Sequence, residues 1–122
     1  MATVLIVDDE EQIRLLLRRW LQTWGYDARV AVSAADALAQ LETTPASIVL
    51  CDVIMPVHDG LWLTDRIRER WPDTAVIMAS GAQDIETVKS TRRKGAVDFV
   101  PKPFGREQLR QALERAAAAT AA

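Results

Sequence analysis

The amino-acid sequence predicts an α/β protein with a parallel sheet of five strands and five helices. Short apolar runs alternate along the chain with longer segments that have helical periodicity. Three of the short runs are apolar throughout, as expected of strands that are covered on both faces. This regular alternation implies parallel strands joined by right-handed crossovers.

The first strand is expected at residues 4–7, which are Val-Leu-Ile-Val. A helix follows at residues 13–24, because apolar side chains recur there at the three- and four-residue spacing of one helix face and the pattern ends near Gly25. The side chains of this face, which we expect to contact the core, are Ile13, Leu16, Leu17, Trp20, Leu21 and Trp24. Residues 28–31 alternate between apolar and polar side chains, which suits a second strand at an edge of the sheet.

The middle of the chain repeats this pattern. Ser33 can cap the amino end of a second helix, which we expect to continue to about Leu41. The third strand is expected at residues 48–51, where the sequence is again apolar throughout. A third helix is expected at residues 61–70, because the Trp-Pro pair that ends at Pro72 stops the helical pattern.

The last four elements are two further strands, each followed by a helix. The strands are expected at residues 75–79 and 97–100, both of which are rich in apolar and β-branched side chains. The fourth helix is expected at residues 85–94, where Gly95 can end it. The fifth helix is expected from residue 106 to about residue 118.

The composition is that of an ordinary globular domain and excludes several classes of protein. The chain has 122 residues, 49% of them hydrophobic and 26% charged, and its single cysteine excludes a disulfide framework or a multi-cysteine zinc site. A net charge of −2 argues against a domain that binds nucleic acid directly. No apolar run approaches the ~20 residues of a membrane span, and no signal peptide is recognisable. We therefore expect a cytoplasmic protein.

Polar side chains follow four of the five expected strands. Asp8 and Asp9 follow the first strand, Asp52 the third, Ser80 the fourth and Lys102 the fifth. We expect these side chains on one rim, because ligands of open parallel sheets bind beyond the carboxyl ends of the strands. Clustered carboxylates repel one another unless a cation joins them, and purely oxygen ligands suit Mg²⁺. With a lysine and a hydroxyl to hold an anion, the pattern predicts phosphoryl chemistry.

Five motifs in this order resemble the receiver domains of two-component response regulators, including the chemotaxis type. They are Val7-Asp8-Asp9-Glu10, Asp52-Val53-Ile54-Met55-Pro56 with Asp59-Gly60, Ala79-Ser80-Gly81, Gly95-Ala96-Val97-Asp98-Phe99 and Lys102-Pro103-Phe104. The resemblance spans residues 3 to about 117 and implies a doubly wound, flavodoxin-like sheet of strand order 2-1-3-4-5. It implies a receiver domain at residues 1–117, with an alanine-rich tail or the start of a linker at residues 118–122.

The resemblance implies that Asp52 is the phospho-acceptor. Its carboxylate would attack a phosphohistidine of a sensor histidine kinase or a histidine phosphotransfer protein and become an acyl phosphate. The cofactor implied is Mg²⁺, with Asp9, Asp52 and the backbone carbonyl of Ile54 as ligands. Asp8 would act mostly through a metal-bound water.

The resemblance also assigns a phosphoryl-binding lysine and a switch. Lys102 would pair with a phosphoryl oxygen, and its peptide bond to Pro103 is usually cis in this family. The Ser80 hydroxyl would turn toward the phosphoryl group and let Phe99 rotate inward, which changes the surface of the fourth helix, fifth strand and fifth helix. As an alternative, Phe99 is a plain core residue of a buried strand.

The sequence departs from the commonest family pattern next to this switch. Ser80 stands where threonine is commoner, and it keeps the hydroxyl that the switch needs. Gly81 stands where alanine is commoner, which leaves the phosphoryl group more open. Together with Ile54 and Ala82, Gly81 is expected to influence the rate of dephosphorylation.

Four other residues attract attention in the sequence. Cys51 is expected to be a buried structural thiol, and His58 a solvated loop residue. Trp62 and Trp71 are less predictable, and an exposed tryptophan at either position would indicate a contact surface.

Three alternative functions remain open from the residues alone. A phosphorylation-independent adaptor is disfavoured by the complete set of site residues. A phosphatase with an aspartyl nucleophile would usually carry a second acid two residues later, where this chain has Ile54. A nucleotide- or flavin-binding protein would need a glycine-rich loop after the first strand, where this chain has acids.

The output of the domain is also left open. We expect no domain before the first strand, and either a free-standing regulator or the front piece of a longer protein with an effector domain. A phosphorylation-dependent homodimer is compatible with both.

Overall fold

The computed structural model describes residues 2–81 and 85–120, and this part of the chain contains the predicted alternation of five strands and five helices. The strands are β1 (Thr3–Val7), β2 (Asp27–Ala31), β3 (Ile48–Asp52), β4 (Ala75–Ser80) and β5 (Asp98–Pro101). The helices are α1 (Glu11–Thr23), α2 (Ala34–Thr43), α3 (Gly60–Arg70), α4 (Ile85–Arg93) and α5 (Arg106–Thr120).

The strands form one parallel sheet in the order β2-β1-β3-β4-β5. The predicted flavodoxin-like topology is therefore confirmed, and β2 is an edge strand as its alternating pattern indicated. Val7 of β1 pairs with Cys51 of β3, and Ser80 of β4 pairs with Pro101 of β5. This register brings the ends of four strands to the same edge of the sheet.

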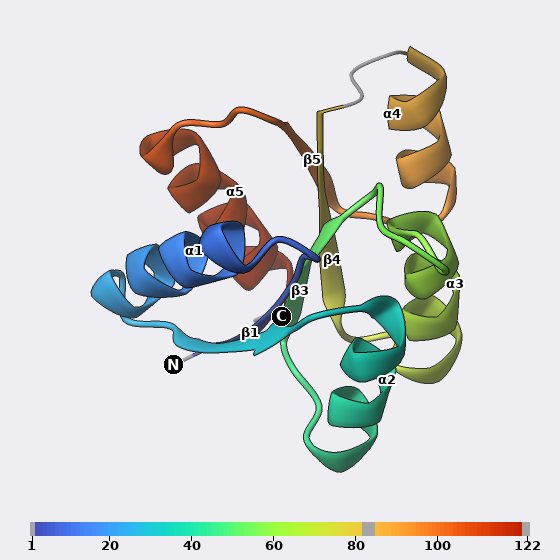
Figure 1. The fold of residues 1–122 in the computed structure, drawn as a ribbon, viewed down its shortest axis with the longest axis horizontal. Coiled ribbons are helices and arrows are strands. Elements are labelled where there is room, and N and C mark those ends of the chain that lie inside the picture. Colours follow the sequence, from blue (N-terminus) through green and yellow to red (C-terminus); the bar gives the residue numbers. More distant parts are fainter. Residues whose placement is uncertain (1, 82–84, 121–122) are drawn as a thin grey trace.

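Helices cover both faces of the sheet (Figure 1). Helices α1 and α5 pack on one face, and α2, α3 and α4 lie on the other. Each face has its own apolar cluster: Leu21 and Leu113 belong to the first, and Leu41, Leu63 and Ile67 belong to the second, all at most 1% exposed. The central strands contribute alternate residues to the two clusters, which is why their sequences are apolar throughout.

The predicted apolar face of α1 is only partly correct. Leu17 and Leu21 are buried, and Trp20 and Trp24 are partly buried against the first cluster. Leu16, however, is 42% exposed, because it lines a hollow between α1 and the loop after β5 instead of contacting the sheet.

Most elements begin or end one or two residues away from the prediction, and two of these differences concern β5 and α5. Strand β5 begins at Asp98, so Val97 lies before it and is 48% exposed, although its N–H still donates to the Val76 carbonyl. Helix α5 continues to Thr120, so alanine residues expected in a tail or linker extend the helix, in keeping with their high helix propensity. Among residues 2–81 and 85–120, no helix has the length and apolar character of a membrane span.

Candidate functional site

Three carboxylates meet at the carboxyl edge of the sheet. Asp8 and Asp9 follow β1, and Asp52 is the last residue of β3. One carboxylate oxygen from each lies within 4.8 Å of the other two. Asp8 is 3% exposed and Asp52 is 7% exposed, whereas Asp9 is exposed to solvent. The structure thus brings together the three acids that the sequence places after two neighbouring strands.

Lys102 connects two of these acids. It follows β5, and its Nζ lies 3.0 Å from Asp8 Oδ2 and 3.2 Å from Asp52 Oδ2. Burial lowers the pKa of the ammonium, but its hydrogen bonds and charge pairing with the two carboxylates outweigh burial and raise that pKa. Lys102 therefore stays positively charged in the site. Its peptide bond to Pro103 is cis.

The charge of this cluster is only partly neutralised by Lys102. Burial raises the pKa of Asp52 above its ordinary value, and the negative charge of Asp8 raises it further, although Lys102 acts in the opposite direction. A cation bound between the carboxylates would remove this repulsion. Three carboxylates in reach of one point, one of them open to solvent, fit a hard divalent ion that keeps part of its water shell.

The loop after β3 supports Asp52 from the other side. The N–H of Ile54 donates to Asp52 Oδ1 at 3.2 Å, while the Ile54 side chain is 62% exposed. The loop ends at Gly60, whose N–H donates to the Val53 carbonyl at 2.8 Å. A Cβ on Gly60 would clash with the carbonyl oxygen of Asp52 and would lie 2.9 Å from the Cα of Val53. Helix α3 can therefore begin this close to the site only with glycine at residue 60.

Ser80 and Phe99 lie on neighbouring strands and on the same side of the sheet. Ser80 is fully buried at the end of β4 and pairs with Pro101, two residues from Phe99 on β5. Side chains two residues apart on a strand point to the same face. Phe99 is partly buried against the second cluster. The N–H of Lys102 donates to the Ser80 carbonyl at 2.8 Å, which links these residues to the acidic cluster.

Gly81 leaves open space beside the site. It is exposed, and a Cβ at this position would meet no atom of the described residues within 4 Å. The structure therefore has room for an alanine at residue 81, the residue that is commoner in the family that the sequence resembles. Ala82, which the sequence places beside Gly81, lies outside the described residues.

The remaining residues singled out from the sequence lie beside the site or contribute to the core. Cys51 is buried, and burial, followed by the charge of Asp52, raises its pKa. The thiol is thereby kept protonated and unreactive. His58 is partly buried and stacks on Trp62 with ring centroids 3.8 Å apart, so it is less solvated than expected. Trp62 and Trp71 are both partly buried against the second cluster.

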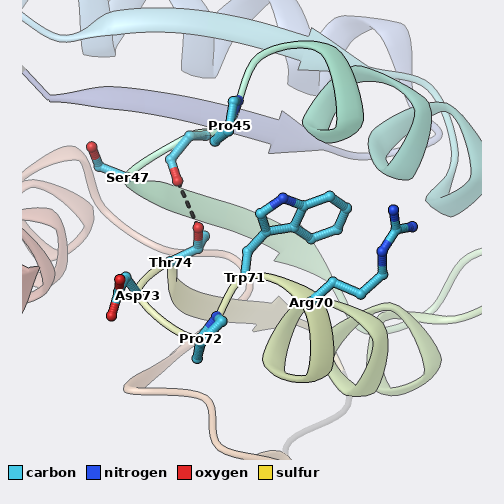
Figure 2. Close-up of a pocket in the computed structure, with 8 residues that line it drawn as sticks. Pro45, Ser47, Arg70, Trp71, Pro72, Asp73 and Thr74 are labelled. Atoms are coloured by element: carbon cyan, nitrogen blue, oxygen red, sulfur yellow. Dashed lines mark hydrogen bonds between the residues drawn. The ribbon is translucent and has the colours of Figure 1, made fainter.

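A separate hollow lies at the opposite end of the sheet, between the loops that precede β3 and β4 (Figure 2). It has a volume of about 470 Å³, and Pro45, Trp71 and Pro72 contribute to its walls. Thr74 Oγ1 donates to the Ala46 carbonyl at 2.8 Å beside it, as the dashed line shows. None of the predicted site residues lines this hollow.

Comparison with known proteins agrees with this arrangement. The model of the response regulator receiver domain matches residues 4–114, which is most of the chain. The chain belongs to the response regulator receiver domain family. The acidic cluster at the carboxyl edge is thus part of a receiver.

Solved structures of similar proteins have the same fold as this receiver. Chemotaxis protein CheY4 of Vibrio cholerae is 30% identical with a TM-score of 0.91, and 95% of this chain and 98% of that chain are covered. The receiver domain of NtrX from Brucella abortus is 38% identical with a TM-score of 0.89, with coverage of 94% and 98%.

Curated relatives of this receiver are longer proteins. The nitrogen assimilation regulatory protein NtrX of Azorhizobium caulinodans is 38% identical over 115 residues, which is 93% of this chain and 25% of that protein. The tetrathionate response regulatory protein TtrR of Salmonella typhimurium is 36% identical over 116 residues, which is 95% of this chain and 56% of that protein. The receiver therefore spans between a quarter and about half of these relatives.

Two residues of the receiver site have roles that sequence reasoning missed. Gly60 was only part of a motif, although its close approach to Asp52 places the start of α3. Arg14 carried no prediction, yet its guanidinium donates to the backbone carbonyl of Asp8 at 2.7 Å. Neither contact has a signal in the sequence, because the approach of Gly60 depends on packing between distant segments and the contact of Arg14 depends on how α1 docks against the loop.

Proposed function

We propose that this receiver accepts a phosphoryl group on Asp52 from the phosphohistidine of a sensor histidine kinase or a histidine phosphotransfer protein. The observation that carries the proposal is the meeting of Asp8, Asp9 and Asp52 with Lys102 at one edge of the sheet. Asp52 is held through both of its carboxylate oxygens, because the Ile54 N–H donates to Oδ1 and Lys102 Nζ donates to Oδ2.

The proposed cofactor is Mg²⁺. Asp9 and Asp52 would hold it through carboxylate oxygens and Ile54 through its backbone carbonyl, while Asp8 would act through a bound water. When bound, Mg²⁺ offsets the negative charge that otherwise keeps a carboxylate and a phosphoryl group apart. The carboxylate cluster and the raised pKa of Asp52 support this assignment.

In the proposed transfer, a carboxylate oxygen of Asp52 forms a bond to phosphorus while the phosphorus–nitrogen bond of the phosphohistidine breaks. The electron pair of that bond returns to the imidazole, which leaves as the neutral ring once protonated. Lys102 lies in contact with Asp52 before transfer and would hold a phosphoryl oxygen afterwards. The chemistry is confined to phosphorylation and dephosphorylation of the domain itself, so the receiver acts as a signalling module.

The proposed output is a change of the α4–β5–α5 surface. Phosphorylation places a group of about −1.5 to −2 charge next to Lys102 and Ser80. Ser80 and Phe99 share one side of the sheet, so a movement of the buried hydroxyl toward the phosphoryl group would change the space available to Phe99. The altered surface would control an effector domain or a separate partner protein, or support a phosphorylation-dependent homodimer.

Intact mass spectrometry tests the proposal. After incubation with Mg²⁺ and acetyl phosphate, the wild-type chain should gain one phosphate, and Asp52→Asn should gain none. Asp73→Asn is the matched control, because Asp73 is exposed at the opposite end of the sheet. A phosphate gain that persists in Asp52→Asn would contradict the proposal.

A further inference from the structure

Arg14 reaches from helix α1 to the backbone between the paired acids. Its Nη1 donates to the Asp8 carbonyl oxygen at 2.7 Å, and the side chain is partly buried. Its own N–H continues the helix by donating to the Glu10 carbonyl at 3.1 Å. A hydrogen bond this short from a charged donor is stronger than one between neutral groups.

The Asp8 carbonyl belongs to the peptide unit that joins Asp8 to Asp9. The Asp8 carboxylate is fixed independently, since Oδ1 accepts from the Glu10 N–H at 2.9 Å and Oδ2 contacts Lys102. The Asp9 side chain is exposed and forms no hydrogen bond or ion pair with residues 2–81 or 85–120. The direction of Asp9 therefore depends on the peptide plane that Arg14 holds.

The start of α1 offers little other support for this loop. Glu10 is the N-cap residue of α1, and its side chain makes no capping hydrogen bond. Within the described residues, the polar contacts of the loop with α1 are the Glu10 N–H to the Asp8 carboxylate and the Arg14 guanidinium to the Asp8 carbonyl. Removal of the second contact frees the peptide plane while the Asp8 carboxylate stays in place.

We propose that Arg14 is a positioning residue for the divalent-cation site, acting through the Asp8–Asp9 peptide instead of touching the cation. The inference rests on the proposed function, because it deepens the assignment of the same acidic cluster. Two effects of Arg14 on cation binding have opposite signs. Its positive charge repels a divalent cation, whereas its hydrogen bond directs Asp9 toward Asp52. Truncation of Arg14 therefore reveals whether charge repulsion or the orientation of Asp9 dominates, and the hydrogen bond to the Asp8 carbonyl favours orientation.

Isothermal titration with Mg²⁺ tests this inference, with thermal unfolding measured in parallel without metal. We expect Arg14→Ala to weaken Mg²⁺ binding by about tenfold, as loss of a group that orients a metal ligand usually does. Arg14→Lys keeps a charged donor and should recover part of the affinity. Arg14→Met keeps the length of the side chain without a donor and should not. Arg18→Ala, which removes an exposed arginine one turn further along α1, should bind Mg²⁺ like wild type.

Unchanged or tighter Mg²⁺ binding by Arg14→Ala would overturn the inference while leaving the proposed function intact. Failure of the wild-type chain to bind Mg²⁺ would instead contradict the proposed function and the inference with it. If Arg14→Ala lowers the unfolding midpoint, the comparison of Arg14→Met with Arg14→Lys separates positioning from a purely structural role. With a purely structural role, these two variants would have the same Mg²⁺ affinity when their unfolding midpoints are equal.

Discussion

Asp52 carries a charge that its surroundings partly disfavour, because it is buried and lies beside Asp8. Its pKa is raised in the folded state, so in the pH range just above the usual value the folded chain binds more protons than the unfolded chain. Protonation of Asp52 therefore contributes to the stability of the fold at low pH, and this contribution is lost as the pH rises through the raised pKa. A cation bound by the cluster would reverse the loss, since a ligand that binds the folded state stabilises it.

Val57 is a second residue under local constraint. It has a φ of 69° and is 95% exposed, so a β-branched side chain occupies the left-handed region without packing that would compensate for it. We expect Val57→Gly to raise the free energy of unfolding by about 1 kcal/mol, because relief of strain exceeds the added freedom of the unfolded chain. Urea unfolding measures the change.

Val97 supplies the control for this prediction. It is also an exposed valine, at 48%, but it lacks a positive φ. Val97→Gly should lower the free energy of unfolding by up to about 1 kcal/mol, as an added glycine ordinarily does. If Val57→Gly destabilises the chain as much as Val97→Gly does, the strain assigned to Val57 is absent.

At the scale of elements, the start of α3 is set by its approach to β3. A Cβ on Gly60 would lie 2.8 Å from the Met78 side chain and would clash with the backbone of Asp52. We expect Gly60→Ala to lower the free energy of unfolding by about 2 kcal/mol and to weaken Mg²⁺ binding, because the helix must move away from the site.

Gly81→Ala is the matched substitution at a glycine beside the same site. A Cβ at residue 81 meets no described atom within 4 Å, so the free energy of unfolding of Gly81→Ala should stay close to that of wild type. Equal urea midpoints for Gly60→Ala and Gly81→Ala would contradict the account of the α3 start.

The elements were largely predictable because their patterns are local. Residues 48–51 are apolar throughout since both faces of β3 are covered, and Ser33 was a correct cap because its hydroxyl accepts from the Asp36 N–H at 3.1 Å. Leu16 was placed wrongly in the core, since periodicity identifies an apolar stripe but not how much of it the sheet covers. Val97 was placed in β5, although the strand begins at Asp98, because apolar character alone does not fix where a strand begins.

The candidate site was predictable where chain position determines it. Asp8 and Lys102 each follow a strand and Asp52 ends one, and the carboxyl ends of parallel strands lie at one edge of the sheet. The contact of Arg14 with a backbone carbonyl and the close approach of Gly60 were not predictable, because both depend on how a helix docks against a loop. The positions of the strand ends predict which side chains come together, whereas the packing of the helices determines which individual atoms are in contact.

At the level of the whole molecule, the sheet lies between two layers of helices (Figure 1). It separates two apolar clusters and carries the acidic cluster at its carboxyl edge. Asp52 ends the central strand β3, its neighbour β4 carries Ser80, and the edge strand β5, which contacts α4, carries Phe99. Under the proposed function, a change of charge at Asp52 would reach the α4–β5–α5 surface through the paired strands β4 and β5.

Borohydride trapping followed by peptide mass mapping determines whether Asp52 becomes an acyl phosphate. Borohydride reduces an aspartyl phosphate to homoserine, so the modified residue is recorded in the mass of its peptide. After treatment with acetyl phosphate and Mg²⁺, we predict homoserine at residue 52, and none when Mg²⁺ is removed with a chelator. Homoserine at another aspartate, or no homoserine in a chain that has gained a phosphate, would contradict the account.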